Sequence, residues 1–320
     1  MAQPDVRGRF LWHELMTRDV VEASAFYPKV ISWKTQPWPQ DRNYTMFTAD
    51  RGPVGGLMTL PADAVAHGAQ PQWLLYIGTP NVDETLDQAR RAGAQVLRAA
   101  HDVATIGRFA VLADPHGASF AIYSPSSPSA TLDAETRNGD FSWHELATAD
   151  GEAALKFYQQ LFGWELMTRM NMGAMGFYNI FGWKGVQRGG IYTKPPADNS
   201  KPNWLSYAQV ANADTATAAA KSAGAKIIQG PMEVPGGSRI TTLLDPQGVA
   251  FAVHSFAPAV KAKPAAKKKA APKAKARAKI KTKAKARVKA RVRAKRAAPK
   301  KAAAGRSAKG KAKRAVRRKK

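Results

Sequence analysis

An internal repeat constrains the fold of this chain more than any other feature of its sequence. The segment Phe10-Leu-Trp-His-Glu-Leu-Met-Thr17 recurs 131 residues later as Phe141-Ser-Trp-His-Glu-Leu-Ala-Thr148. Later landmarks recur in the same order, and such matches along the whole length indicate a tandem duplication of one domain. We place the two domains at residues 1–127 and 139–256, and the Ser- and Pro-rich stretch between them predicts a linker at 128–138.

Each predicted domain divides into two units with the same order of elements. An alternating strand at 10–17 precedes Asp19, which has the residue type and position of a helix N-cap, and an amphipathic helix that runs to about residue 33. Three more strands follow. The second half repeats this order and ends its third strand in a tight turn at Asp114-Pro-His-Gly117. The unit is βαβββ, it is predicted four times, and the fold class is α+β.

This order of elements resembles the vicinal oxygen chelate superfamily, which includes glyoxalase I, the bleomycin resistance proteins and the extradiol dioxygenases. The resemblance rests on the Phe26-Tyr27 pair in the first helix, the Asp-Pro-x-Gly turn, and the Trp12-His-Glu-Leu-Met-Thr17 opening, which is similar to two-domain glyoxalase-like proteins of bacteria. It covers about residues 8–256. It implies that paired βαβββ units curl around an open cavity that holds a divalent metal, a small hydrophobic ligand, or both.

The metal positions of that family fall on side chains that cannot bind a divalent cation. Such a cation needs oxygen or nitrogen donors, and these positions carry Trp, Ala, Leu or Ile. We therefore expect no metal and no other cofactor, and a metal-dependent lyase or dioxygenase is the weaker alternative. The positions are Trp12, Leu57, Leu74 and Ala121 in the first domain, and Trp143, Ile191, Leu205 and Ala252 in the second.

The first strand offers a carboxylate as the candidate catalytic group. Because side chains alternate along a strand, Phe10, Trp12, Glu14 and Met16 are predicted to face the cavity, and His13 to face the helix layer. On an aromatic wall, Glu14 and its counterpart Glu145 could have a raised pKa and act as a base or hydrogen-bond acceptor. A salt bridge or a rim position is the alternative. For His13 and His144 a structural role is favoured over metal binding.

Aromatic side chains are dense in the predicted strands, which favours a small-molecule cavity. The residues expected to line it are Trp12, Trp73, Tyr76, Trp143, Trp204 and Tyr207. The Gly55-Gly56 and Gly189-Gly190 pairs indicate either β-bulges or close approach of a ligand, and the bulge is favoured. The predicted partner of the cavity is a small organic ligand.

The C-terminal segment 257–320 differs sharply from the rest of the chain. It holds 29 Lys and Arg residues and no acidic residue, whereas residues 1–256 hold 21 basic and 23 acidic side chains. Such a segment is predicted to be disordered, resembles linker-histone tails, and should bind nucleic acid without sequence preference. Binding to an anionic membrane surface or to polyphosphate, or a solubility role, is the alternative, and the membrane is disfavoured because no hydrophobic wedge accompanies the charge. The densest basic clusters are Lys267, Lys268, Lys269, Arg291, Arg293, Arg317, Arg318, Lys319 and Lys320.

The sequence is compatible with two hypotheses for the function of the whole chain. In the first, a metal-independent binding or enzymatic module is tethered to nucleic acid by the tail. In the second, the folded part is catalytically silent and the chain is an architectural DNA-binding protein, with a homodimer also open. The absence of cysteine excludes disulfides and thiolate sites. No stretch is apolar enough for a membrane span, so we expect a cytoplasmic, nucleoid-associated protein.

Overall fold

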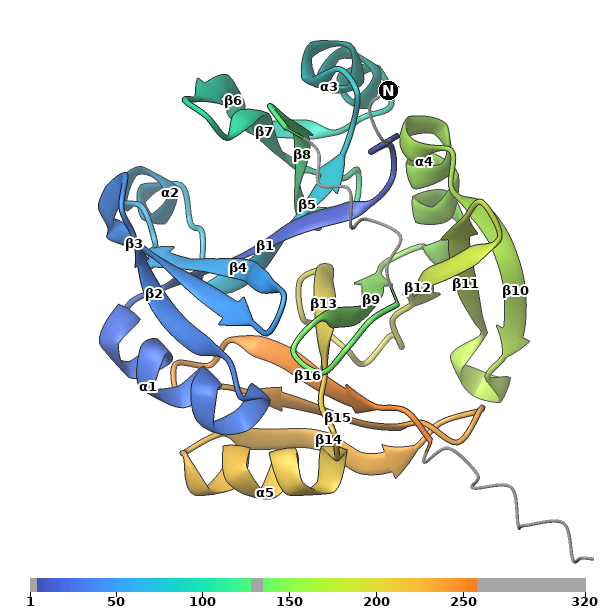
Figure 1. Ribbon diagram of the computed structural model, residues 1–320. Coiled ribbons are helices and arrows are strands. Elements are labelled where there is room, and N and C mark those ends of the chain that lie inside the picture. Colours follow the sequence, from blue (N-terminus) through green and yellow to red (C-terminus); the bar gives the residue numbers. More distant parts are fainter. Residues whose placement is uncertain (1–4, 128–134, 258–320) are drawn as a thin grey trace, which may run out of the picture. The chain divides into compact units, whose positions relative to one another are not determined.

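The computed structural model describes residues 5–127 and 135–257 (Figure 1). Residues 135–138 of the predicted linker and Ala257 of the predicted tail are therefore included, and the rest of both segments lies outside the described residues. The described residues belong to one compact unit, Met1–Val260.

The first domain contains two βαβββ units joined by a short helix. Its elements in chain order are β1 (Phe10–Thr17), α1 (Val20–Ile31), β2 (Lys34–Trp38), β3 (Asp41–Ala49), β4 (Gly52–Thr59), α2 (Ala62–Ala66), β5 (Gln72–Gly78), α3 (Val82–Arg91), β6 (Gln95–Val103), β7 (Gly107–Ala113) and β8 (Ser119–Pro125).

The second domain repeats this order with two differences: no described helix corresponds to α2, and a 3₁₀ turn is inserted after β10. Its elements are β9 (Phe141–Thr148), α4 (Gly151–Phe162), β10 (Glu165–Asn171), η1 (Gly173–Met175), β11 (Phe177–Trp183), β12 (Val186–Thr193), β13 (Asn203–Gln209), α5 (Ala213–Ser222), β14 (Lys226–Glu233), β15 (Arg239–Leu244) and β16 (Ala250–Ser255).

Each domain forms one eight-stranded mixed sheet, and the two sheets have the same strand order. The orders are β2-β3-β4-β1-β5-β8-β7-β6 and β10-β11-β12-β9-β13-β16-β15-β14. The first strands of the two units pair antiparallel at the centre of each sheet, and each also pairs in parallel with the last strand of its own unit. The α+β class and the four predicted βαβββ units are thus confirmed.

Local sequence signals place the ends of the helices. Asp19 accepts a hydrogen bond from the backbone N–H of Glu22 at 2.9 Å, as expected for an N-cap, and Asp150 caps α4 in the same way. Helix α1 ends at Ile31, slightly earlier than predicted, because Ser32 adopts a left-handed conformation that stops it.

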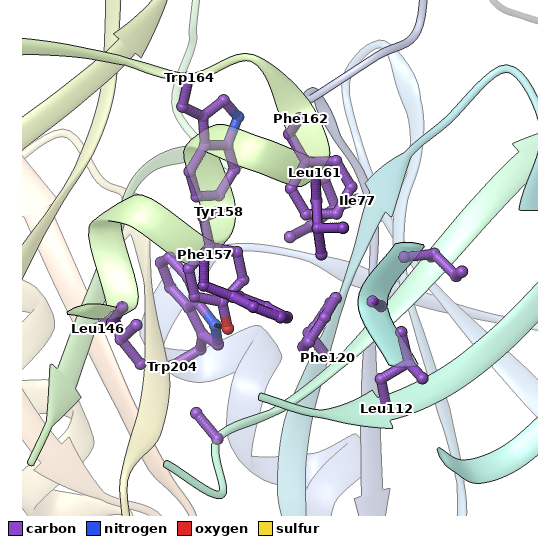
Figure 2. Close-up of a cluster of buried hydrophobic side chains, with 14 of the residues drawn as sticks. Ile77, Leu112, Phe120, Leu146, Phe157, Tyr158, Leu161, Phe162, Trp164 and Trp204 are labelled. Atoms are coloured by element: carbon purple, nitrogen blue, oxygen red, sulfur yellow. Dashed lines mark hydrogen bonds between the residues drawn. The ribbon is translucent and has the colours of Figure 1, made fainter. Parts of the chain in front are cut away.

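Among the described residues, two large hydrophobic cores each contain side chains from both domains, and a third, small cluster of Leu74, Tyr76 and Ala121 belongs to the first domain alone. One joins β5, α3, β7 and β8 of the first domain to α4 and neighbouring strands of the second. The other joins α1 and its strands to α5 and β16. Figure 2 shows the first of these cores, where Phe157 and Tyr158 of α4 point toward Phe120 of the other domain. Neither core is complete without the partner domain.

Buried hydrogen bonds reinforce this crossed packing. The hydroxyl of Tyr27 donates to Asp245 at 3.0 Å, and that of Tyr158 donates to Asp114 at 3.0 Å. Each aspartate opens an Asp-Pro-x-Gly turn and also accepts two backbone N–H groups within it. The helix Tyr and the turn Asp, which recur in the sequence, therefore hold one domain against the other.

A pair of buried histidines links the two central strands. The Nε2 atoms of His13 and His144 lie 2.8 Å apart. The Nδ1 of His144 lies 3.3 Å from the carbonyl oxygen of Arg188, so this nitrogen carries a proton and donates it. The Nε2 of His144 is then an acceptor, and the Nε2–H of His13 is the donor. The two histidines bridge the domains.

The position of Phe10 corrects the predicted alternation along β1. Phe10 was expected to face the cavity together with Trp12. The register of β1 against β5 shifts between these two residues, which is the signature of a β-bulge. Phe10 consequently turns to the other face, where its ring stacks on His144 with the ring centroids 3.6 Å apart.

Burial of the histidine pair predicts a specific loss of stability in acid. Burial lowers the pKa of His144 to about 3, and burial together with His144 lowers the pKa of His13. Stability is therefore full above the unfolded value of 6.5 and falls with decreasing pH, because only the unfolded chain binds these protons. Below pH 6, His144→Gln should reduce the slope of unfolding free energy against pH by about 1.4 kcal/mol per pH unit.

Urea unfolding of the full chain between about pH 6 and 4.5 measures this slope. A change of about 1.4 kcal/mol per pH unit is what one histidine contributes when only the unfolded chain binds its proton. Glu14 and Glu145 have raised pKa values and act in the opposite direction, but they are present in both proteins and cancel in the difference. His67→Gln, at an exposed position after α2, is the matched control and should keep the wild-type slope. Equal slopes in wild type and His144→Gln would contradict a neutral buried pair.

Candidate functional site

The first domain has a cavity of about 1360 Å³ on the face of its sheet that points away from the cores. This exceeds the roughly 300–1,000 Å³ of typical small-molecule sites, so a ligand would fill only part of it. The part of the wall formed by the central strands is mostly apolar and aromatic. Its side chains are Trp12, Glu14, Met16, Tyr44, Met46, Met58, Leu74, Tyr76, Phe109, Val111 and Tyr123.

Strand register determines which residues reach this wall. Trp12 lies opposite Tyr76 across the central pair of strands, and Glu14 lies opposite Leu74. Tyr76 in turn lies beside Ala121 of β8. Because side chains alternate along a strand, Trp12, Glu14 and Met16 share the cavity face with Leu74 and Tyr76.

Glu14 is the polar centre of the wall. Only 8% of its surface is exposed, and its two carboxylate oxygens accept hydrogen bonds from Tyr44 at 2.9 Å and Tyr76 at 2.8 Å. The indole N–H of Trp12 donates to the Tyr44 hydroxyl at 2.9 Å. Burial raises the pKa of Glu14, while the two tyrosine hydrogen bonds and the charge of Arg98 offset part of the rise.

The second domain builds the same arrangement around Glu145. Tyr178 and Tyr207 donate to its oxygens at 2.9 and 3.2 Å, and the indole of Trp143 donates to Tyr178 at 2.9 Å. Burial raises the pKa of Glu145 as well. We refer to each set of one Trp, one Glu and two Tyr residues as a Glu–Tyr site. Among the described residues neither glutamate forms the salt bridge that the sequence left open; both are held by hydroxyl groups.

Tyr44 and Tyr178 complete the two sites, although neither was among the site residues predicted from the sequence. A Cβ atom on Gly56 would collide with the Tyr44 hydroxyl, and one on Gly190 would collide with the Tyr178 ring. The second glycine of each pair therefore makes room for one of these tyrosines, beside a shift of register in each strand pair. Tyr44 and Tyr178 share the sequence spacing of the glycine pairs, a signal that could have identified them.

Trp73 and Trp204 do not line a cavity, which corrects the sequence assignment. Their indole N–H groups donate to the buried hydroxyls of Tyr27 and Tyr158, each at 3.0 Å, inside the two cores. Trp73 lies three residues before Tyr76, and an odd separation along a strand places two side chains on opposite faces. The remaining predicted wall residues are part of the Glu–Tyr sites.

Leu57 and Ile191 also differ from their assignment as metal positions of the family. Both are fully buried in the cores. Leu57 pairs with Leu15 in β1, which faces the helices, whereas its neighbour Met58 lines the cavity. The position predicted in this strand thus differs by one residue from the position that faces the cavity, and a shift of one residue moves a side chain to the other face of a sheet.

The donor atoms on the cavity wall do not fit the divalent metal that the fold implies. The positions at Trp12, Leu74 and Ala121 offer no carboxylate or imidazole. Glu14 is the one carboxylate that the described residues place on the part of the wall formed by the central strands, and His13 is engaged with His144 on the other face. Within residues 5–127 and 135–257, no three His, Asp or Glu side chains are grouped to hold a metal ion.

The nucleic-acid residues predicted from sequence, from Lys267 to Lys320, all lie outside the described residues. Among the described helices, none is long and apolar enough to cross a membrane.

Both domains match known families. Residues 141–253 match the Glyoxalase/Bleomycin resistance protein/Dioxygenase superfamily, and residues 13–123 match a Glyoxalase-like domain. The chain is 32% identical over 251 residues to "Putative glyoxylase CFP32" of Mycobacterium tuberculosis (strain CDC 1551 / Oshkosh), covering 77% of this chain and 94% of the relative. It is 27% identical over 267 residues to Anthracycline biosynthesis protein DnrV of Streptomyces peucetius, covering 77% and 92%.

Solved structures share the fold at low sequence identity. A substrate complex of homoprotocatechuate 2,3-dioxygenase from Brevibacterium fuscum has a TM-score of 0.56 at 14% identity, covering 80% of this chain and 84% of that chain. The Mn(II)-bound glyoxalase from Novosphingobium aromaticivorans has a TM-score of 0.53 at 17% identity, covering 80% and 84%. From the sequence matches and the shared architecture, this chain belongs to the glyoxalase/bleomycin resistance protein/dioxygenase superfamily.

Proposed function

We propose that the folded part binds a small, largely apolar organic molecule in the first-domain cavity and holds or transforms it without a divalent metal. The observation that carries this proposal is the Glu–Tyr site: a buried carboxyl group on an aromatic wall, in a cavity large enough for a ligand. Relatives named as a glyoxylase and an anthracycline biosynthesis protein are compatible with small-molecule chemistry.

Glu14 is the group that would meet a polar atom of the ligand. A carboxylate has about four lone-pair positions, and only two are used by Tyr44 and Tyr76. A ligand hydroxyl can therefore donate to Glu14, and burial strengthens such a charged hydrogen bond. The raised pKa of Glu14 also makes it a better proton acceptor than an exposed carboxylate.

Two compounds, 2-naphthol and naphthalene, test this cavity by their own fluorescence. 2-Naphthol should bind the full chain, and Met16→Trp should weaken binding because the larger side chain takes up space on the wall beside Glu14. Ala147→Trp, at the matching position of the second domain, is the control and should leave this binding intact. Glu14→Gln should weaken 2-naphthol about tenfold but spare naphthalene, which has no hydroxyl to donate. No saturable binding of either compound would reject the proposal.

Metal independence is tested separately. The weaker alternative, a metal-dependent lyase or dioxygenase, requires donors that the wall does not offer. Elemental analysis of the full chain, purified without chelator, should find well below one divalent ion per chain. A stoichiometric ion that is lost in Glu14→Gln but kept in the matched variant Glu84→Gln, at an exposed position of α3, would overturn this part of the proposal.

The basic segment is proposed to tether this module to nucleic acid. Its 29 positive charges would displace counterions condensed on the phosphate backbone, which favours binding without reading the bases. The segment has no aromatic residue after position 256 to stack on exposed bases. The alternative function is a catalytically silent architectural DNA-binding protein. It would bind DNA through the same basic segment and differ in having no ligand in the cavity.

Truncation after Val260 should abolish retardation of duplex DNA while thermal unfolding of the folded part stays unchanged. For the full chain, the apparent Kd should rise about a thousandfold between roughly 50 and 200 mM salt, because several phosphates are neutralised at once. A chain with residues 261–320 in shuffled order keeps every charge and should bind equally well. Loss of binding on shuffling, or equal binding by the truncated chain, would refute the assignment.

A further inference from the structure

The two Glu–Tyr sites are alike, but the residues on the outer strands differ between the domains: β6 and β7 in the first, β14 and β15 in the second. In the first domain Arg98 pairs with Val111, and His101 pairs with Phe109. The matching register positions of the second domain hold Gln229 opposite Thr242 and Met232 opposite Ile240. These positions lie on equivalent strands at the same 131-residue spacing as the two histidines. The Glu–Tyr sites are common to both domains and support a common chemistry. The residues on β6 and β14 differ and therefore distinguish the two domains.

Arg98 projects a positive charge into the first-domain cavity. It lines the cavity, and its guanidinium lies over the ring of Phe109, 5.9 Å from the ring centroid. Within the described part of the chain, Arg98 forms no ion pair, whereas the neighbouring Arg108 is paired with two aspartates. Its charge also reaches Glu14 and Tyr76, whose pKa values it lowers against the larger effect of burial.

The charged residues that the first-domain sheet and α2 contribute to this cavity differ in sign between its two sides. Lys201 of the second domain adds one further positive charge to the lining. Arg98 and His101 lie on β6, at one edge of the strand order. The acidic lining residues Asp41 and Asp63 lie at the start of β3 and in α2, beside the other edge. Between them the wall is aromatic. A ligand with an anionic group at one end would therefore be oriented by the cavity rather than merely accommodated.

We propose that the first-domain cavity selects planar aromatic anions, with the ring against Phe109 and the anionic group on Arg98. The other end of the ligand then faces Glu14, Tyr44 and Tyr76. This selectivity belongs to the first domain, since a neutral Gln229 and an aliphatic Ile240 replace the cation and the ring in the second. The inference rests on the small-molecule function proposed above and adds the ligand class.

The test compares 2-naphthoate with naphthalene, which share the ring system and differ by one carboxylate. Fluorescence titrations use the full chain at pH 7 and about 0.3 M NaCl, which screens the exposed charges of the basic segment. Arg98→Gln should weaken 2-naphthoate about five- to tenfold, as expected for one charge-assisted contact that is partly exposed, and leave naphthalene unchanged. Arg98→Lys, which keeps the charge, should recover part of the loss.

Lys201→Gln is the matched control, because it removes one positive charge from the rim of the same cavity. Its effect on 2-naphthoate should stay below about twofold, since an exposed rim charge contributes little. Equal losses in both variants, or unchanged 2-naphthoate affinity in Arg98→Gln, would overturn the inference while 2-naphthol binding still upheld the proposed function. If none of the three compounds binds, the cavity is not a ligand site and both proposals fail.

Discussion

The structure depends on one constraint: each domain buries its helices against side chains supplied by the other. Helix α1 packs in a core that contains α5, and α4 packs in a core that contains β5, β7 and β8. Aromatic rings such as Phe157 and Phe120 meet across the boundary, and two buried Tyr–Asp hydrogen bonds fix the angle between the domains. Removal of one domain would expose apolar side chains of both cores, so we expect neither domain to be stable without the other.

This packing leaves the opposite face of each sheet free for chemistry. Strand β1 serves both purposes, because Leu15 and His13 face the domain contact while Trp12 and Glu14 face the cavity. A strand whose two faces are both committed cannot shift its register by one residue without destroying the core and the site together. The Glu–Tyr site is therefore held by elements that are rigid for other reasons, as preorganised binding requires.

The sequence predicted the parts of the fold that depend on local signals. The N-cap at Asp19, the turn at Asp114 and the alternation along β1 from Trp12 to Thr17 are all encoded within a few residues. The failures involve partners far apart in the chain. Trp73 was predicted to face the cavity from the density of aromatic residues, although its odd separation from Tyr76 places it on the opposite face. Phe10 was predicted on the wrong face because the bulge beside it depends on the pairing of β1 with β5. The contact of His13 with His144, and the space that Gly56 gives to Tyr44, exist only after folding.

The histidine bridge has a consequence for the relation between the two halves. Two imidazoles that face each other through the same nitrogen have only one hydrogen between them, so one ring must give it and the other must take it. The backbone carbonyl beside His144 decides the direction. A perfect twofold arrangement is therefore forbidden at the very centre of the molecule. However similar their amino-acid sequences become, the first half and the second half cannot be electrically identical.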